Sequence, residues 1–537
     1  IMFLIYRSPG LVFIPLLILV SALMVARFVA AVVVDLTGLP LNDQVTSIMS
    51  VLLFGVGTNY VLFIVSRYRE EITRSGDRFQ AMESAMKKVG PSIIGSSMTT
   101  VVAMFLLIFS MLGSFKTMGP MLAITVSIML IVALTVLPAA IVLMSRVAFW
   151  PNRIIANQQD VVTKPIWQKI GKFVVNRPRT VFLVTTAVLL IAITPSIRMI
   201  PSFNFIDGFP DDVESKAGYE LLKKGFAPGD LSPTTVFIHT PDNDVIDQSD
   251  FIELLAQEIE NSPGVNHVKG MTRPYGSYIG DQLDAVSLKM FNSPDGTTSR
   301  LDVSLEGDPY SEKALSVIDD LRSIIKSTIR SQSMTGVEVL VGGDTAVQFD
   351  TKTVIDEDTK LLAPLILFAI LGVLIVIQRS LVAPLYLLFS VIISYAATFG
   401  ISIFIFQDLL NHTGVAYSNG IWIFVFLVAL GADYNIFVIA RIKEETERLG
   451  FNEGIAVAVG KTGGVVTSAG IILASTFAVL TTLPLRDVFQ LGMAVMLGVL
   501  IDTFVVRTLL VPSMASILKS YSWWPSLGPG KSSATRH

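Results

Sequence analysis

The stretch "GADYNIFVIARIKEE" at residues 431–445 recurs as "GTNYVLFIVSRYREE" at residues 57–71. The glycine, the tyrosine, the phenylalanine, the arginine and the final pair of glutamates stand in the same register in both copies. The similarity extends upstream, from "LIYRS" (4–8) to "VIQRS" (376–380), and downstream, from "IIGSSMTT" (93–100) to "VVTSAGII" (465–472) and from "TVLPA" (135–139) to "LLVPS" (509–513). A repeat of this length predicts a chain built from two homologous halves.

Both halves are predicted to be helical and to lie in a membrane. Hydrophobic residues make up 52% of the 537 residues and charged residues only 15%, and the mean hydropathy is +0.64. Such a composition is far from that of soluble domains. An apolar helix needs about 20 residues to cross the hydrocarbon core of a bilayer. We expect ten spans, near residues 10–36, 45–66, 92–112, 118–145, 179–200, 361–378, 382–407, 419–440, 464–483 and 489–517.

The segment from residue 201 to residue 357 has a mixed polar sequence and is predicted to be a soluble domain. Its acidic residues outnumber its basic ones roughly two to one, and it carries most of the acidity of the chain. Short β-rich stretches at 234–240, 265–272, 284–291, 300–307 and 336–343 alternate with amphipathic helices at 250–260 and 311–329. The order β-α-β-β-β-α-β is close to a split ferredoxin-like α+β module.

The distribution of basic residues predicts how the chain lies across the membrane. Arg and Lys gather at alternate span ends, around Arg7, Arg67 to Lys88, Arg146 to Arg179, Arg379, Arg441 to Lys461 and Lys519. Cytoplasmic loops carry such an excess. We therefore expect the acidic domain to be external, the C-terminus to be cytoplasmic, and the chain to be a multi-pass protein of a bacterial plasma membrane.

These patterns divide the chain into predicted segments. They are first-half helices at 1–150, a cytoplasmic linker at 151–178, a single span at 179–200, the external domain at 201–357, second-half helices at 358–518 and a cytoplasmic tail at 519–537. The opening "IMFLIYRSPG" is typical of the end of a helix. Since the second half has a span and a domain before "VIQRS", we expect the first half to own equivalents, and the sequence to be truncated at its N-terminus.

Asp433 is the first candidate for chemistry, because it lies inside an apolar run about 12 Å from the helix end at Arg441. An ionisable group near the middle of a bilayer is expensive and usually faces a bundle interior or a water-filled route. Burial disfavours its charged form, so it could carry a proton. The structural alternative is a protonated Asp433 held in a helix contact. Tyr434 adjoins it, and the repeat places Asn59 and Tyr60 at the equivalent positions, where Asp433 could face Asn59.

Asp502 and Arg507 form a second pair of buried charges, in "GVLIDTFVVRTLLVP". A spacing of five residues is about 140° around an α-helix, so we expect each to find its partner on another helix, unlike an i,i+4 pair. Structural ion pairing and a proton path are both compatible with them. Hydroxyl clusters at comparable depth in the two halves could join a relay or pack helices together; they are Ser96, Ser97, Thr99 and Thr100 in the first half, and Thr467 and Ser468 in the second.

Other chemistries find no support in the sequence. The four histidines are scattered and there is no cysteine, so neither a metal site nor a disulfide is predicted. No nucleophile and base have a spacing that favours an enzyme, and no cofactor or nucleic acid is implied. The charged "REE" and "KEE" runs that end the two repeated stretches are interpreted as solvated helix ends.

The two "G-x-[DN]-Y-x-x-F" helices running into "R-x-[RK]-E-E", the "LIDTFVVRTLLVP" helix and an external domain after a single span together resemble the MMPL family of the RND transporter superfamily. The resemblance covers essentially the whole chain. It implies a pseudo-twofold helical repeat with twelve spans and two external porter domains in a complete protein, driven by inward proton flow and exporting lipids or other hydrophobic molecules. The present spans would run from the end of the second helix to the sixth, then the seventh, then the eighth to the twelfth.

The resemblance also assigns residues. The family's proton-relay Asp-Tyr pair falls on Asp433 and Tyr434, its counterpart on Asn59 and Tyr60, and its charged pair in the last helix on Asp502 and Arg507. Asn59 departs from the Asp of the family, which bears on the number of protons moved. No residue matches the relay Lys of the drug-efflux branch, which favours lipid export.

Three functional hypotheses follow, and the first is favoured. It is secondary active export, with protons, the bilayer and a lipid or other hydrophobic substrate as partners. The others are small-drug efflux by the same chemistry and a membrane scaffold that senses a lipid without transporting it. The sequence is compatible with a monomer or a homo-oligomer.

Overall fold

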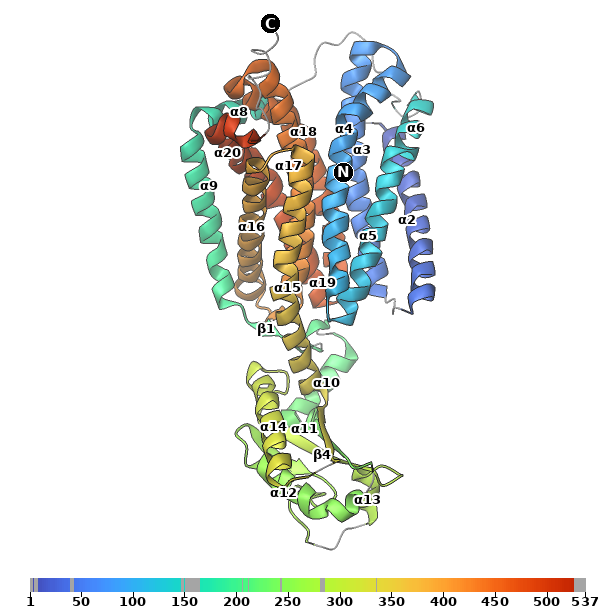
Figure 1. Ribbon diagram of the computed structural model, residues 1–537, viewed down its shortest axis with the longest axis vertical. Helices are drawn as coiled ribbons and strands as arrows, with labels where there is room; N and C mark the ends of the chain where they lie inside the picture. Colours follow the sequence, from blue (N-terminus) through green and yellow to red (C-terminus); the bar gives the residue numbers. More distant parts are fainter. Residues whose placement is uncertain are drawn as a thin grey trace.

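A computed structural model describes residues 3, 8–38, 43–145, 149, 165–204, 206–210, 212–241, 244–280, 285–334 and 336–525. A bundle of long helices has a smaller α+β domain beyond one end (Figure 1). Ten helices among the described residues are long and apolar enough to cross a membrane, which confirms the ten predicted spans. Most of "LIYRS", most of the predicted linker and the end of the predicted tail lie outside the described residues.

Within its described residues, the first half contributes five α-helices. They are α2 (Gly10–Thr37), α3 (Asp43–Ser75), α4 (Arg78–Phe105) with the 3₁₀ turn η1 (Leu106–Phe109), α5 (Gly113–Leu134) and α6 (Val136–Leu143). Local signals set their ends. The Asp77 side chain accepts a hydrogen bond from the backbone N–H of Gln80 at the start of α4, and Gly38, with φ of 68°, ends α2.

The second half has the same plan, preceded by an amphipathic helix. Its helices are α8 (Pro165–Asn176), α9 (Pro178–Ile193), η2 (Thr194–Arg198), α15 (Asp344–Gln378), α16 (Val382–Ile403), η5 (Phe404–Leu409), α17 (Asn419–Leu449), α18 (Phe451–Ala478), η6 (Val479–Thr482), α19 (Arg486–Ile501), η7 (Asp502–Leu510), α20 (Val511–Leu518) and η8 (Lys519–Trp523).

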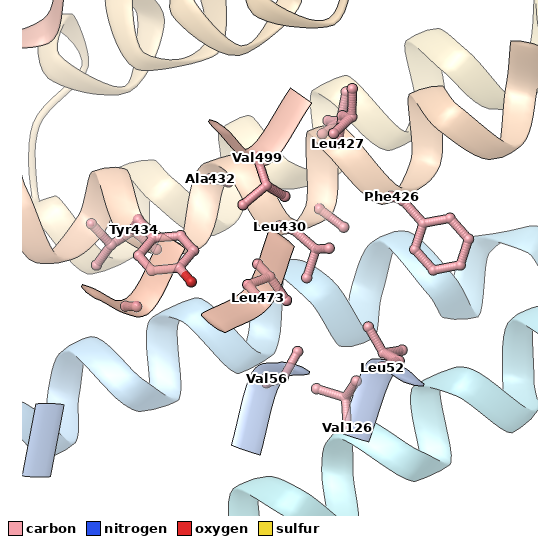
Figure 2. Packing of buried hydrophobic residues seen from close by; sticks show 14 of the residues in the cluster. Leu52, Val56, Val126, Phe426, Leu427, Leu430, Ala432, Tyr434, Leu473 and Val499 are labelled. Atoms are coloured by element: carbon pink, nitrogen blue, oxygen red, sulfur yellow. The ribbon is translucent and has the colours of Figure 1, made fainter. Parts of the chain in front are cut away.

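The two helices that carry the repeated stretch lie at the centre of the bundle. The apolar window of α17 is 94% buried and that of α3 is 83% buried, against 28% for α2 and for α15. Figure 2 shows Leu52 and Val56 of α3 pointing toward Leu430 of α17 and Leu473 of α18. A methyl group on Gly55 would lie 2.6 Å from Leu473, so this contact depends on a small residue.

The α+β domain holds a four-stranded sheet in the order β3-β4-β2-β5, with every neighbouring pair antiparallel. The strands are β2 (Thr234–His239), β3 (Val265–Lys269), β4 (Thr298–Leu305) and β5 (Glu338–Gly342). The helices and turns of the domain are η3 (Ile206–Gly208), α10 (Glu214–Gly225), α11 (Pro228–Leu231), η4 (Val245–Gln248), α12 (Ser249–Glu260), α13 (Ala285–Phe291) and α14 (Glu312–Ser331). The apolar faces of α12 and α14 bury Ile252, Leu255 and Leu321 in a core with Val236 and Val303 of the sheet.

One predicted strand is wrong. Residues 285–291 form helix α13, so the order is β-α-β-α-β-α-β. The alternation of Val286, Leu288 and Met290 resembles a strand, but Val286 and Met290 are exposed whereas Ser287 and Phe291 are buried, as on one turn of a helix.

Two connections join the domain to the bundle. Helix α15 runs without a break from Asp344, next to the sheet, to Gln378 at the far end of the bundle, across the predicted boundary at 357/358. The short strand β1 (Pro201–Ser202) pairs in parallel with β6 (Val415–Ala416) just before α17. Movements of the domain and of the bundle are therefore mechanically linked through α15.

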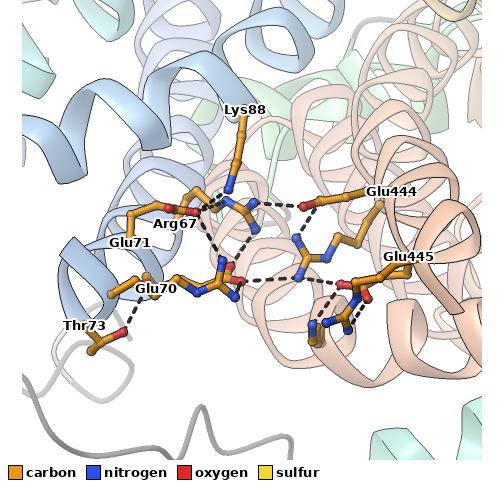
Figure 3. A network of polar contacts seen from close by, with 11 residues as sticks. Arg67, Glu70, Glu71, Thr73, Lys88, Glu444 and Glu445 are labelled. Atoms are coloured by element: carbon orange, nitrogen blue, oxygen red, sulfur yellow. Dashed lines mark hydrogen bonds and ion pairs between the residues drawn. The ribbon is translucent and has the colours of Figure 1, made fainter.

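The prediction that the "REE" and "KEE" runs are solvated is wrong for their last residues, Glu71 and Glu445, which are 7% and 3% exposed, whereas Glu444 is exposed. Arg67, one helical turn before Glu71, is also buried, at 7% exposure. The repeat brings the ends of α3 and α17 together at the end of the bundle opposite the α+β domain, where these charges pair with one another and with lysines of α4 and α18 (Figures 1 and 3).

Candidate functional site

Asp433 is buried where the two halves meet. It belongs to α17 of the second half, is 6% exposed, and faces α4 of the first half. The hydroxyl groups of Thr99 and Thr100 each lie 3.1 Å from its Oδ1, and that of Thr100 lies 3.2 Å from its Oδ2. Within the part of the chain that the structure describes, no Lys, Arg or His forms an ion pair with it. A carboxylate in such surroundings is neutralised by a proton more readily than by a counter-ion.

Thr99 and Thr100 have a choice of acceptor. The Thr99 hydroxyl also lies 2.7 Å from the backbone carbonyl oxygen of Ser96, and the Thr100 hydroxyl 3.3 Å from the same atom. Each hydroxyl has one proton to donate. When Asp433 is ionised both can donate to it; when it is protonated, it can donate to one of them while they donate to Ser96. Both protonation states therefore have hydrogen-bond partners without a change of backbone.

Other predicted relay residues extend this contact within the first half. The Tyr60 hydroxyl hydrogen-bonds to Ser97 Oγ at 2.7 Å and to Ser96 Oγ at 3.4 Å. A short series of hydroxyls thus runs from Tyr60 on α3 along α4 to Asp433. Asn59 is buried beside Tyr60, and its exposed fraction is 6%. The hydrogen bonds of Asp433 go to α4 and not to Asn59.

The hydroxyls predicted in the second half do not join this series. Thr467 and Ser468 lie partly exposed on α18, and no hydrogen bond to Asp433 or Tyr434 is found for them among the described residues. Lys88 contacts Glu71 as Lys461 contacts Glu445. Counting from these lysines, Ile472 and Leu473 correspond to Thr99 and Thr100, which shifts the predicted alignment of α4 with α18 by one residue. The site is therefore polar on one side of the pseudo-twofold axis and apolar on the other.

The prediction that Asp502 and Arg507 find partners on other helices is wrong. They form an ion pair with each other, with side chains 6% and 2% exposed. The reason is local: residues 502–510 form the π-helix η7. In a π-helix hydrogen bonds link residues five apart, so positions 502 and 507 lie on the same face.

This ion pair reaches the Asp433 region through Tyr434. The Arg507 guanidinium carbon lies 3.6 Å from the centroid of the Tyr434 ring. A desolvated cation over an aromatic ring gains about 2 kcal/mol. The pair also borders a cavity of about 10 Å³ lined by Ser394, Leu430, Gly431 and Val499, which is about the space that one water molecule needs.

Small residues allow close helix contacts at the π-helix and on the helix α19 that precedes it. A methyl group on Gly470 of α18 would lie 2.1 Å from Thr503 Oγ1, and one on Gly498 of α19 would lie 2.5 Å from Leu427.

Among the described residues, no group of three or more His, Asp or Glu side chains could hold a metal ion.

Comparison with known proteins identifies the family of the chain. The model of the MMPL family matches residues 1–181 and 207–534. The chain belongs to the MMPL family. Its MMPL relatives include the membrane protein SCO5905 of Streptomyces coelicolor, which is 37% identical over 522 residues, covering 97% of this chain and 59% of the relative. The chain thus spans a little over half the length of this relative.

Two further relatives have names that state a transported molecule. The apo-petrobactin exporter of Bacillus anthracis is 32% identical over 540 residues, which cover 97% of this chain and 69% of the exporter. The sulfolipid-1 exporter MmpL8 of Mycobacterium tuberculosis is 23% identical over 817 residues, which cover 98% of this chain and 74% of the exporter.

Proposed function

We propose that this MMPL chain is the transport module of a proton-driven exporter that moves lipids or other hydrophobic molecules across the bacterial plasma membrane. The single observation that carries the proposal is Asp433, a buried carboxylate whose partners are hydroxyls able to serve both of its protonation states. A carboxylate with only a structural role would need hydrogen-bond partners for one protonation state, and not for both. Because Asp433 belongs to one half and its partners to the other, a change in its protonation alters a contact between the halves.

In this proposal Asp433 is the only carrier at the symmetric pair of positions. Asn59 cannot take up a proton, and Ile472 and Leu473, at 5% and 0% exposure, present no hydroxyl to it. One proton per cycle would pass through the Asp433 site, with Tyr60, Ser96 and Ser97 as relay hydroxyls. Tyr434 and the Asp502–Arg507 pair would hold the carboxylate in a fixed field.

The α+β domain is proposed to be an external porter domain of the ferredoxin-like class. The antiparallel order β3-β4-β2-β5 supports the class. The gathering of Arg67, Lys88, Arg441 and Lys461 at the opposite end supports the orientation, because basic residues favour the cytoplasmic side. The continuous helix α15 would transmit the protonation-dependent movement from the bundle to this domain.

The substrate class rests on the relatives. One is named as an exporter of sulfolipid-1 and another as an exporter of apo-petrobactin. We propose that the substrate of this chain is a lipid or another hydrophobic molecule and that the direction of transport is export.

The test is proton flux in proteoliposomes that contain the full-length protein and a lipid extract as substrate. With an imposed pH gradient, the wild type should carry protons in step with lipid movement, and Asp433→Asn should abolish both while remaining folded. Asp319→Asn, which removes an exposed carboxylate of α14, is the matched control and should transport normally. Full flux through Asp433→Asn would refute the mechanism. Retention of a lipid by a wild type that moves no protons would indicate a lipid-binding scaffold.

A further inference from the structure

The ends of α3 and α17 form a charged cluster whose two sides mirror each other. Arg67 Nη2 lies 3.0 Å from Glu444 Oε1, and Arg441 Nη2 lies 3.5 Å from Glu70 Oε1. These are equivalent positions of the repeat, so the same contact is made twice, once in each direction. Figure 3 shows the labelled members Arg67, Glu70, Glu71 and Lys88 of the first half facing Glu444 and Glu445 of the second.

Each arginine also has partners on its own helix. Arg67 pairs with Glu70 at 2.6 Å and Glu71 at 3.3 Å, and Arg441 pairs with Glu444 at 2.7 Å and Glu445 at 2.9 Å. Residues three and four apart face one another along a helix, so these pairs persist when the helices move as rigid bodies.

The lysines hold the two most buried glutamates in the same way. Lys88 Nζ lies 2.7 Å from Glu71 Oε1, and Lys461 Nζ lies 2.8 Å from Glu445 Oε1. Lys88 and Glu71 both belong to the first half, and Lys461 and Glu445 both belong to the second. The glutamate side chains are 9% and 4% exposed, so each would be a costly buried charge without its partners.

Every buried charge in the cluster therefore keeps a partner within its own half if the halves separate. Among the ion pairs of the described residues in this cluster, the two across the boundary, Arg67 to Glu444 and Arg441 to Glu70, are the ones that would break. A buried ion pair normally resists opening because it leaves an unpaired charge behind. This cluster avoids that cost, so its arrangement suits a contact that opens and closes.

We infer that the two contacts across the boundary form a releasable ionic latch that holds the halves together at the end of the bundle opposite the α+β domain. The latch biases the bundle toward the arrangement that is closed at this end, and its opening permits the complementary arrangement. Its role in transport rests on the proposed function, since the movement it controls is then the transport movement. The latch itself is a property of the two helices and stands apart from proton flux.

Spin labels attached to introduced cysteines can measure the latch, because these 537 residues contain no cysteine of their own. Spin labels on Ser75→Cys and Glu447→Cys, two exposed positions on α3 and α17, report the distance between the helix ends in the full-length protein in lipid nanodiscs. The variant E70Q/E444Q removes the two carboxylates that cross the boundary and leaves Glu71 and Glu445 for the arginines. The control E83Q/E453Q removes two exposed carboxylates, and with them the Lys87–Glu83 pair, which lies within α4 alone.

The wild type and the control should give one short distance. E70Q/E444Q should add a longer distance and raise the ratio of separated to closed pairs by roughly tenfold. If E70Q/E444Q proves unstable, the single variant E444Q, whose side chain is already 48% exposed, should show the same longer distance at a smaller fraction. Distance distributions identical to the control in both variants would overturn the latch.

Proton flux measured on the same samples separates the two proposals. A second distance in E70Q/E444Q together with a wild type that moves no protons would retain the latch and refute the proposed function. Normal proton flux in the wild type, together with an unchanged distance in E70Q/E444Q, would retain the proposed function and refute the latch.

Discussion

Phe63 and Phe437 stack face to face between the two halves, with ring centroids 3.9 Å apart and planes 6° from parallel. They are equivalent residues of the repeat, so the pseudo-twofold axis passes between their rings. The Phe63 ring also meets the edge of Tyr434 at 6.2 Å between centroids. The stack therefore lies between the Asp433 site and the charged cluster.

The contributions of Phe63 and Phe437 to the unfolding free energy should be coupled. Aromatic pairs gain about 0.5–1.5 kcal/mol beyond the area they bury. We expect Phe63→Ala and Phe437→Ala to lower the unfolding free energy by amounts whose sum exceeds the loss in the double variant by about 0.5–1.5 kcal/mol. Unfolding of the four proteins of this cycle in detergent measures the coupling. Strict additivity would show that the rings touch without stabilising the boundary.

In the proposed proton-driven mechanism, the threonines that face Asp433 should set the pH range of transport. In the double variant Thr99→Val and Thr100→Val the ionised carboxylate loses both hydroxyl donors, so the protonated form gains relative stability. The proton-coupled flux should then peak at a higher pH than in the wild type. Thr125→Val is the control, because the Thr125 hydroxyl is buried but donates only to Met121 of its own helix, and its profile should not move. An unchanged optimum in the double variant would mean that another group limits flux.

The Asp502–Arg507 pair should stabilise the fold only as a pair. Arg507→Met leaves a buried carboxylate without its counter-ion and should cost about 3–5 kcal/mol of unfolding free energy. Asp502→Leu should cost a similar amount. The double variant, which removes both charges, should cost clearly less than the sum of the single variants, as thermal unfolding in detergent will show. A double variant as unstable as that sum would mean that each charge acts through another partner.

Much of the fold can be predicted from the sequence because the bilayer restricts it so strongly. A span must be apolar over about 20 residues, so the ten spans are visible directly. The strand predicted at 284–291 fails because Val286, Leu288 and Met290 do not distinguish a strand from a single helical turn. The prediction for Asp502 and Arg507 is wrong because a π-helix changes which residues share a face, and nothing in "LIDTFVVRT" shows that change.

For the candidate site too, some features can be predicted from the sequence and others cannot. Asp433 is evident because a carboxylate in an apolar run is costly, and the hydroxyls Thr99 and Thr100 stand out for the same reason. Which hydroxyls contact Asp433 depends on a packing of α17 against α4 that links residues far apart in the sequence. The burial of Arg67 and Glu71 is hidden for the same reason, since Glu444 lies in the other half.

His412 should make stability depend on pH. It lies outside the spans, between η5 and β6, where burial and the Arg486 guanidinium lower the pKa of its ring. The folded state then binds fewer protons than the unfolded state. The stability is present above about pH 6.5 and falls as the pH drops from that value toward the lower folded pKa. Thermal unfolding between pH 5 and pH 8 should show this acid loss in the wild type and a smaller one in His412→Gln. Equal slopes would assign the loss to other groups.

The contact between Gly470 and Thr503 should tolerate no added carbon. In Gly470→Ala the new methyl group would lie 2.1 Å from Thr503 Oγ1, and α18 and η7 would have to separate. Such overpacking costs about 1–3 kcal/mol. Gly464→Ala, on the same helix with no heavy atom within 4 Å of its new methyl group, is the matched control and should be neutral or stabilising, since alanine favours helices. Thermal unfolding in detergent compares the two. A Gly470→Ala protein as stable as the control would show that η7 moves aside without cost, and the Asp502–Arg507 pair would then not be held in place by α18.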